Sequence, residues 1–208
     1  MTDLGAELHE EDQAEPRADA VPTRGFGLGL AVLGAIGLAA AFALTVDKIR
    51  LLEDPTFKPS CDLNPVLSCG SVMVTDQASA FGFPNSLLGL VGFSVVVTVG
   101  VLLASGARLP SWVLVGLAGG ASLGLALVHW LAFQSLYRIG ALCPWCLVVW
   151  SVTIPIAVWS VLVALRTTTR SRVVDALWSV RYLLVLGWYL LVVVLALVRF
   201  WDYWSTLV

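Results

Sequence analysis

The chain has 208 residues, of which 59% are hydrophobic and 12% are charged, with a formal net charge of −2 and a mean hydropathy of +0.90. An average soluble domain carries about 25% charged residues, so this composition excludes a soluble globular domain, a disordered chain and a nucleic-acid binder. The long apolar runs instead indicate an all-α integral membrane protein.

Residues 1–24 are predicted to form a disordered, acidic, cytoplasmic tail. Half of the fourteen acidic residues lie within the first nineteen positions, and Pro16 and Pro22 follow or interrupt them. A secretory signal begins with a short positive segment, which this tail lacks. We therefore expect the first apolar run to remain in the mature protein as a membrane span.

Five stretches between charged residues reach or approach the roughly 20 residues that a membrane-spanning helix needs. We expect spans near 25–46, 86–105, 112–136, 143–165 and 182–200. Connection 166–181 is basic, and the positive-inside rule places it in the cytoplasm. The N-terminus is then cytoplasmic, whereas loop 47–85 and the end of segment 182–208 face outward. Glycines 116, 120 and 124, spaced four apart, predict close packing of the third span.

The four cysteines form two pairs by position. Cys61 and Cys69 lie in loop 47–85, and Cys143-Pro-Trp-Cys146 opens the fourth span. Two crossings separate the pairs, so both are expected on the same, exocytoplasmic side, where disulfides persist. Pro144 suits the first turn of a helix, and the N–H groups there favour a thiolate. This pattern predicts a redox-active dithiol.

Other interpretations of the cysteines remain open. Cys61 and Cys69 could form a purely structural disulfide, and the chain could be a membrane metal-binding or structural protein with four cysteine ligands. We expect no metal site, because the wide first spacing does not match the common zinc pattern. An unrelated type of four-span membrane enzyme forms disulfides and reduces quinone, but it carries its C-x-x-C in the first outer loop. Here the order of the two pairs is reversed.

The electron acceptor is expected to be a quinone. The glycine-rich Gly25-Phe-Gly-Leu-Gly29 segment opens an apolar span and has no strand before it, so it is not a nucleotide-binding loop. Three segments, in their order along the chain, resemble the bacterial vitamin K epoxide reductase family over roughly residues 25–165. They are Cys61-Asp-Leu-Asn-Pro-Val-Leu-Ser-Cys69-Gly-Ser-Val, Phe81-Gly-Phe-Pro-Asn-Ser-Leu-Leu-Gly89 and Cys143-Pro-Trp-Cys146.

The resemblance implies a four-transmembrane-helix bundle around a quinone site, with a lid helix over 70–83 and a fifth, peripheral transmembrane helix. It implies that Cys146 contacts the quinone and pairs with Cys143, while Cys69 relays exchange from Cys61, which meets the protein substrate. Menaquinone is the expected quinone. Because no thioredoxin-like domain follows the fifth span, the expected partner is a separate periplasmic thioredoxin-like (DsbA-like) protein. The implied activity supports disulfide formation in exported proteins, and the enzyme itself is expected in the plasma membrane.

Four further residues are candidates for contact with the quinone. Asn85 resembles the asparagine that binds a quinone carbonyl, and it could also cap the second span; we favour the quinone contact, because a buried amide needs a hydrogen-bond partner. Ser86 follows it, and Trp150 occupies a position where some family members have a tyrosine. His129 could supply a proton, or it could bond another helix, as lone polar side chains within membranes do. Asp54 could pin the cysteine loop or remain a solvated acid.

Overall fold

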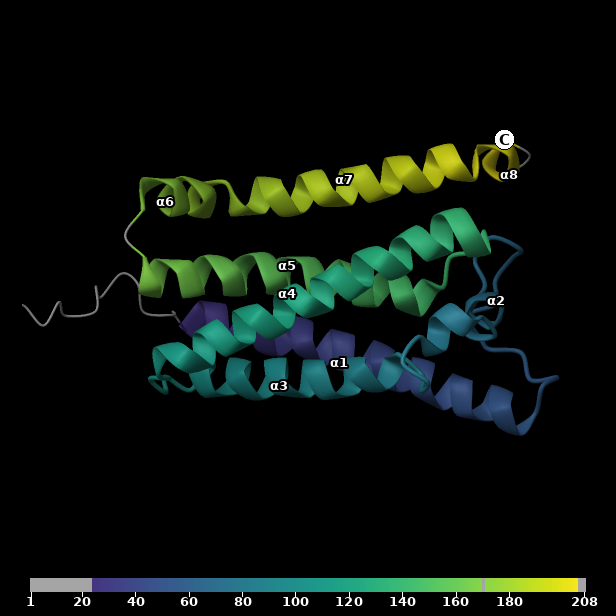
Figure 1. The fold of residues 1–208 in the computed structure, drawn as a ribbon, viewed down its shortest axis with the longest axis horizontal. Helices are drawn as coiled ribbons and strands as arrows, with labels where there is room; N and C mark the ends of the chain where they lie inside the picture. Colours follow the sequence, from purple (N-terminus) through teal and green to yellow (C-terminus); the bar gives the residue numbers. More distant parts are fainter. Residues whose placement is uncertain (1–23, 170, 206–208) are drawn as a thin grey trace, which may run out of the picture.

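The computed structural model describes residues 24–169 and 171–205, and within them five helices are long and apolar enough to cross a membrane (Figure 1). The predicted number of spans is confirmed, and the protein is a helical integral membrane protein. Apart from Arg24, the predicted N-terminal tail lies outside the described residues. The five helices are α1 (Arg24–Glu53), α3 (Ser86–Ala104), α4 (Ser111–Gln134), α5 (Pro144–Thr168) and α7 (Arg181–Arg199).

The first outer loop begins later than the sequence analysis placed it. The helix α1 continues through residues 47–53, so the prediction of a loop from residue 47 is wrong. The helix stops where Pro55 disfavours helical backbone at the preceding residue. There the Asp54 carboxylate accepts hydrogen bonds from the hydroxyl (2.7 Å) and the backbone N–H (2.8 Å) of Thr56. These bonds lower the pKa of Asp54 and close the turn that opens the loop.

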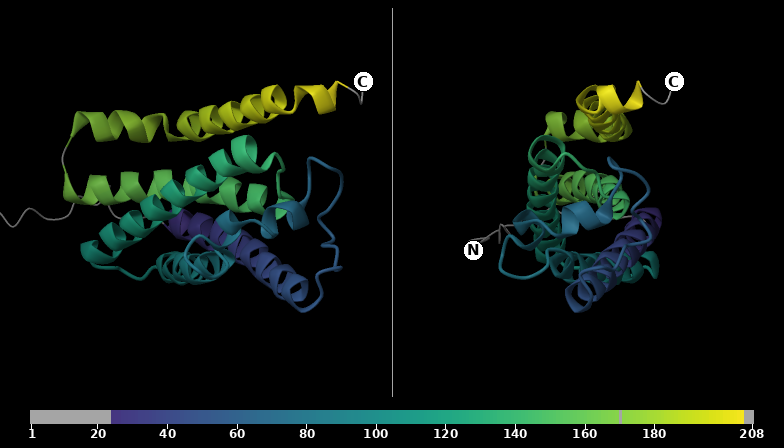
Figure 2. Two further views of the ribbon diagram at one scale, coloured as in Figure 1. Left: turned by 45° about the vertical axis from the view of Figure 1, so that its right-hand side comes forward. Right: turned by 90° about the vertical axis from the view of Figure 1, so that its right-hand side faces the viewer.

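Helices α1, α3, α4 and α5 form the bundle, in which α5 packs against both α1 and α4 (Figure 2). The most extensive interface joins α1 to α3, where glycines let the two backbones approach closely. A Cβ atom on Gly100 would lie 2.5 Å from the backbone nitrogen of Ala31, and one on Gly27 would lie 2.4 Å from that of Ala104. Any larger residue at either position would push the helices apart.

The glycines of α4 do not pack in this way, so that prediction is wrong. A Cβ atom on Gly116, Gly120 or Gly124 would have no neighbouring atom within 4 Å. All three residues instead line a partly open cavity. The same four-residue spacing therefore serves two purposes in this protein, close contact between α1 and α3 and open space beside α4.

Short helical elements complete the two ends of the bundle. The predicted lid helix is two separate turns, α2 (Cys69–Met73) and the 3-10 turn η2 (Asp76–Ser79). At the opposite end, predicted connection 166–181 is largely helical, since α5 runs on to Thr168 and α6 covers Arg172–Ser179. The Arg166 guanidinium there lies 3.4 Å from Asp175 and 4.9 Å from the ring centroid of Trp178.

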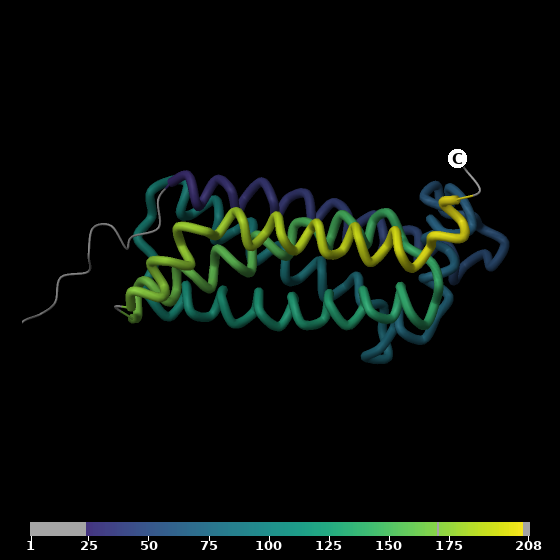
Figure 3. Tube along the Cα trace, turned by 90° about the horizontal axis from the view of Figure 1, so that it is seen from above, coloured from purple at the N-terminus to yellow at the C-terminus, as the bar shows by residue number. Residues whose placement is uncertain are grey.

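Helix α7 lies outside the four-helix bundle, as predicted, and runs alongside α5 (Figures 2 and 3). Within Arg181–Arg199, all of which the structure describes, only Val185 is buried. The helix leads into the short α8 (Trp201–Trp204) at the end of the bundle that carries α2 (Figure 1). The fifth span therefore presents most of its surface to lipid.

Candidate active site

All four cysteines lie at one end of the bundle, as the number of crossings between them predicts. Cys61 and Cys69 form a disulfide with a Cα–Cα distance of 5.7 Å, and Cys143 and Cys146 are free thiols. The Cys143 sulfur lies 3.1 Å from the Cys69 sulfur. Cys69 and Cys143 are both fully buried. The two pairs therefore meet through a sulfur–sulfur contact that is shielded from solvent.

Backbone pairing between two distant loops produces this contact. Leu142, just before Cys143, forms an isolated parallel bridge with Leu67, just before Ser68 and Cys69. The Leu142 N–H donates to the Val66 carbonyl at 2.7 Å, and the Ser68 N–H donates to the Leu142 carbonyl at 3.0 Å. Because backbone atoms make both bonds, the positions of the two cysteines depend little on side-chain freedom.

Side chains within the outer loop hold its shape. The Asp62 carboxylate accepts hydrogen bonds from the Ser68 hydroxyl at 3.0 Å and from the Gly70 N–H at 2.8 Å. A Cβ atom on Gly70 would lie 2.7 Å from this carboxylate, so a larger residue there would displace the Asp62 side chain. Asn64 caps the same turn by accepting from the N–H groups of Val66 and Leu67. The sequence analysis missed both polar residues, although each stands within the Cys61–Cys69 motif.

Two charged residues near the end of α1 also reach the site, and the sequence analysis missed them as well. The Asp47 carboxylate lies 4.0 Å from the Cys61 sulfur. The Lys48 ammonium donates to the Met73 carbonyl at 2.7 Å, which ties the last turn of α2 to α1. The extension of α1 beyond the predicted span places both side chains here, so the early predicted end of that helix concealed them.

Helix α5 begins at the second pair and activates its first thiol. Cys143 occupies the N-cap position and Pro144 the first turn, as the motif predicts. The Cys146 thiol donates a hydrogen bond to the Cys143 sulfur. That bond, together with backbone N–H groups at the helix start, holds the pKa of Cys143 below its usual value, although burial acts in the opposite direction. A lowered pKa favours the thiolate, which is the reactive form.

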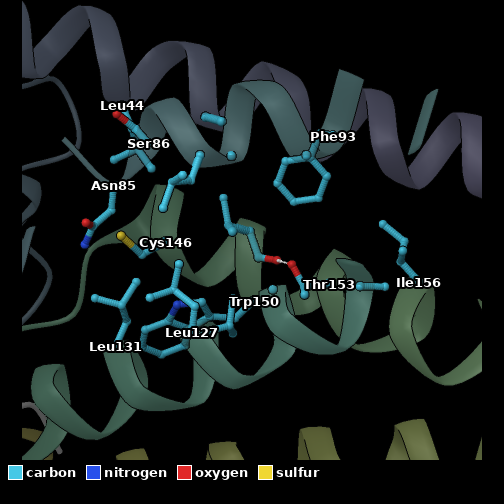
Figure 4. Close-up of a pocket in the computed structure, with 18 of the residues that line it drawn as sticks. Leu44, Asn85, Ser86, Phe93, Leu127, Leu131, Cys146, Trp150, Thr153 and Ile156 are labelled. Atoms are coloured by element: carbon cyan, nitrogen blue, oxygen red, sulfur yellow. Dashed lines mark hydrogen bonds between the residues drawn. The ribbon is translucent and has the colours of Figure 1, made fainter. Parts of the chain in front are cut away.

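An apolar cavity of about 530 Å³ lies between the four bundle helices and reaches both Cys143 and Cys146. Its volume is in the range that suits a small organic ligand. Figure 4 shows Cys146, Asn85 and Ser86 toward one end of this pocket, with Phe93 and Ile156 farther along it. Aliphatic side chains and the α4 glycines form most of its wall. The volume and the mostly apolar lining suit a largely apolar ligand.

Three of the four candidate quinone contacts line this cavity. The Asn85 amide donates to the Gln77 carbonyl at 2.7 Å and accepts from the Ala80 N–H at 3.2 Å, so it holds the lid and keeps one N–H free of these bonds. The Ser86 hydroxyl accepts from Thr45 at 2.9 Å. Trp150 is buried and lines the cavity.

The structure does not bring His129 to the cavity. Its ring accepts a hydrogen bond from the Trp188 indole of α7 at 2.7 Å, and its other nitrogen lies 2.8 Å from the Leu125 carbonyl. This is the second of the two roles that the sequence left open, a bond to another helix. A lone polar residue within a membrane is satisfied by either role, so the sequence alone could not separate them.

The metal-binding interpretation finds no support in this arrangement. Two of the four cysteines are joined in a disulfide, and among residues 24–169 and 171–205 no group of three His, Cys, Asp or Glu side chains is placed so that it could hold a metal ion.

Comparison with known proteins agrees with the geometry. No curated relative matches the chain. The model of the vitamin K epoxide reductase family matches residues 28–161, which include all four cysteines and the four bundle helices apart from their outermost turns. This match covers well over half of the sequence. The chain therefore belongs to the vitamin K epoxide reductase family.

Proposed function

We propose that the protein is a quinone-reducing thiol–disulfide oxidoreductase that oxidises a separate thioredoxin-like protein on the exocytoplasmic side of the plasma membrane. Family membership supports a redox enzyme of the vitamin K epoxide reductase kind. The observation that carries the proposal is a continuous row of sulfur atoms. The row starts at Cys61 in the outer loop, crosses the 3.1 Å contact between Cys69 and Cys143, and ends at Cys146 on the cavity wall.

The first exchange takes place at the outer loop. A thiolate of the partner attacks the Cys61 sulfur, a partner–Cys61 disulfide forms, and Cys69 leaves as a thiolate. The second thiol of the partner then attacks the partner's first sulfur in that mixed disulfide and releases Cys61. The partner has lost two electrons and gained a disulfide, and the loop pair has been reduced to two thiols.

The second exchange moves these electrons to α5. The Cys69 thiolate attacks Cys143 when Cys143 and Cys146 are disulfide-bonded, and Cys146 leaves as a thiolate at the cavity. Cys61 then attacks Cys69, which restores the Cys61–Cys69 disulfide and releases Cys143. The structure has the arrangement that follows this step, with the loop pair oxidised and the α5 pair reduced.

The cavity residues hold the acceptor that takes two electrons from the α5 thiols. A quinone supplies a two-electron, two-proton acceptor, so the two α5 thiols become a disulfide again as a quinol forms. The spare N–H of Asn85 and the indole N–H of Trp150 are donors suited to its carbonyl oxygens. The mostly apolar wall surrounds the Cys146 sulfur with side chains that do not compete for hydrogen bonds. Menaquinone is the quinone that we propose.

Charge distribution supports the proposed orientation. Arg166, Arg172 and Arg181 lie at the end of the bundle that carries α6, opposite the cysteines (Figure 1). Basic residues collect on the cytoplasmic side of membrane proteins. The cysteine end then faces the oxidising side, where a secreted or periplasmic partner can reach Cys61.

A quinol-formation assay on the purified protein tests the proposal. A reduced thioredoxin-like donor is supplied with menaquinone or, in a parallel arm, ubiquinone. We expect donor oxidation and quinol formation in equal amounts, and we expect Cys146→Ala to abolish quinol formation while the donor still reduces the Cys61–Cys69 disulfide once. Full activity of the Cys146→Ala variant would refute the assignment. Stoichiometric zinc in the purified protein, without quinone reduction, would favour the metal-binding interpretation.

A further inference from the structure

The end of the fifth span contacts the active site, although the rest of that span faces lipid. Phe200 directly follows α7 and is only 8% exposed, whereas Val198 is 71% exposed and Trp201 is 63% exposed. Phe200 belongs to one packed cluster with Val66, Leu142 and Trp150. Two of these residues make the backbone bond that aligns Cys69 with Cys143, and the third lines the cavity.

A charged hydrogen bond reinforces this contact. The Arg199 Nε donates to the Leu136 carbonyl at 3.0 Å. Leu136 lies in η3 (Ser135–Ile139), the π-helical turn that ends α4. A cation near the C-terminal end of a helix complements the partial negative charge of its carbonyl groups. Gly140, at a φ of 73°, then turns the chain toward Leu142 and Cys143.

Two other polar contacts fix α7 farther along the bundle. The Trp188 indole donates to His129 of α4, and the Tyr189 hydroxyl donates to the Ser151 carbonyl of α5. A polar side chain that loses its partner within a membrane bears a desolvation cost, so these bonds favour one docked position of α7. The end of the helix is thereby held over η3 and the start of α5 (Figure 3).

We propose that Arg199 and Phe200 are positioning residues for sulfur exchange. They brace η3 and the Leu142 segment, and so keep Cys143 at exchange distance from Cys69. Because residues 199 and 200 lie beyond the segment matched by the family, the family does not supply this role. The proposal deepens the proposed function, on which it rests.

Disulfide partition in a Cys146→Ser background tests the brace without quinone or partner. The three remaining cysteines then hold one disulfide, either Cys61–Cys69 or Cys69–Cys143, and acid quenching, alkylation and mass spectrometry measure the ratio. Removing the Arg199 bond or the Phe200 ring should lower the Cys69–Cys143 fraction about five- to thirtyfold. The variants are Arg199→Gln and Phe200→Ala, and Arg199→Lys, which keeps the charge and a donor, should restore most of the ratio.

The exposed neighbours provide matched controls. Val198→Ala and Trp201→Ala should leave the ratio within about twofold of the parent protein. The proposal would be overturned if Arg199→Gln and Phe200→Ala kept the ratio of the parent protein. It would also be overturned if the two controls shifted the ratio as much as these two variants do. If Phe200→Ala does not fold, the comparison of Arg199→Gln with Arg199→Lys decides.

A second measurement separates this inference from the proposed function. With a reduced thioredoxin-like donor, Arg199→Gln should lower kcat for donor oxidation and leave the KM for the donor unchanged, because the brace does not touch Cys61. A wild-type protein that fails to reduce quinone would refute the proposed function. The partition experiment would still decide whether residues 199 and 200 position Cys143.

Discussion

Replacing Gly124 by valine adds a branched side chain to the cavity wall near the middle of α4. A Cβ atom at this position would have open space around it, so the side chain can enter the cavity without moving a helix. Valine adds three carbons and displaces a similar volume of ligand. At about 0.8 kcal/mol per buried CH₂ group, the lost contact amounts to about 2.4 kcal/mol, or roughly a 60-fold rise in the Kd for quinone.

Binding of a quinone to the detergent-solubilised protein, followed by quenching of tryptophan fluorescence, measures this change. Gly119→Val is the matched control, because Gly119 has the same open surroundings but does not line the cavity. Gly116 lies about 12 Å farther along the helix, so valine there should weaken binding of a long-tailed quinone more than that of a short-tailed one. Equal quinone affinity of the Gly124→Val and Gly119→Val proteins would refute our assignment of the cavity.

Three other outcomes follow from the structure. A Cys61→Ala variant should accumulate a Cys69–Cys143 disulfide, since those sulfurs already lie 3.1 Å apart. Non-reducing peptide mass spectrometry detects this disulfide. Free thiols at both positions after mild oxidation would contradict the prediction. The Cys146 thiol lowers the pKa of Cys143, so thiolate absorbance should appear at a higher pH in Cys146→Ala than in wild type, and an unchanged or lower midpoint would be inconsistent with this cause. Gly100→Ala should lower the free energy of unfolding by about 1–3 kcal/mol, because its Cβ would lie 2.5 Å from the α1 backbone; chemical denaturation in detergent measures the loss, and wild-type stability would argue against tight α1–α3 packing.

Much of this fold could be predicted from local properties of the sequence. Gaps between charges locate membrane spans because bilayer thickness sets a minimum apolar length. The shared side of the two cysteine pairs follows from the even number of crossings between them. The end of α1 was misplaced because charges at 47–53 end an apolar run without ending a helix, whereas Pro55 limits the helix itself.

The details of the site depend on non-local contacts that local patterns do not encode. The approach of Cys69 to Cys143 depends on a bridge between Leu67 and Leu142, which are 75 positions apart. Small residues at four-residue spacing fit either close packing or a cavity wall, and only the neighbouring helix decides which. The placement of His129 depends in the same way on Trp188, a residue of a helix whose docking the sequence does not reveal.

The bridge between Leu67 and Leu142 also affects how such an enzyme can adapt. Because main-chain atoms set the register of the inner sulfur relay, substitutions that spare the turn at Asp54–Thr56 and the contacts of Asp62 and Asn64 leave that relay in place. The stretch from residue 57 to residue 60 can therefore accumulate changes that suit a new client protein. The chemistry at the lipid-soluble oxidant need not be rebuilt each time, so client choice and oxidant choice can evolve separately.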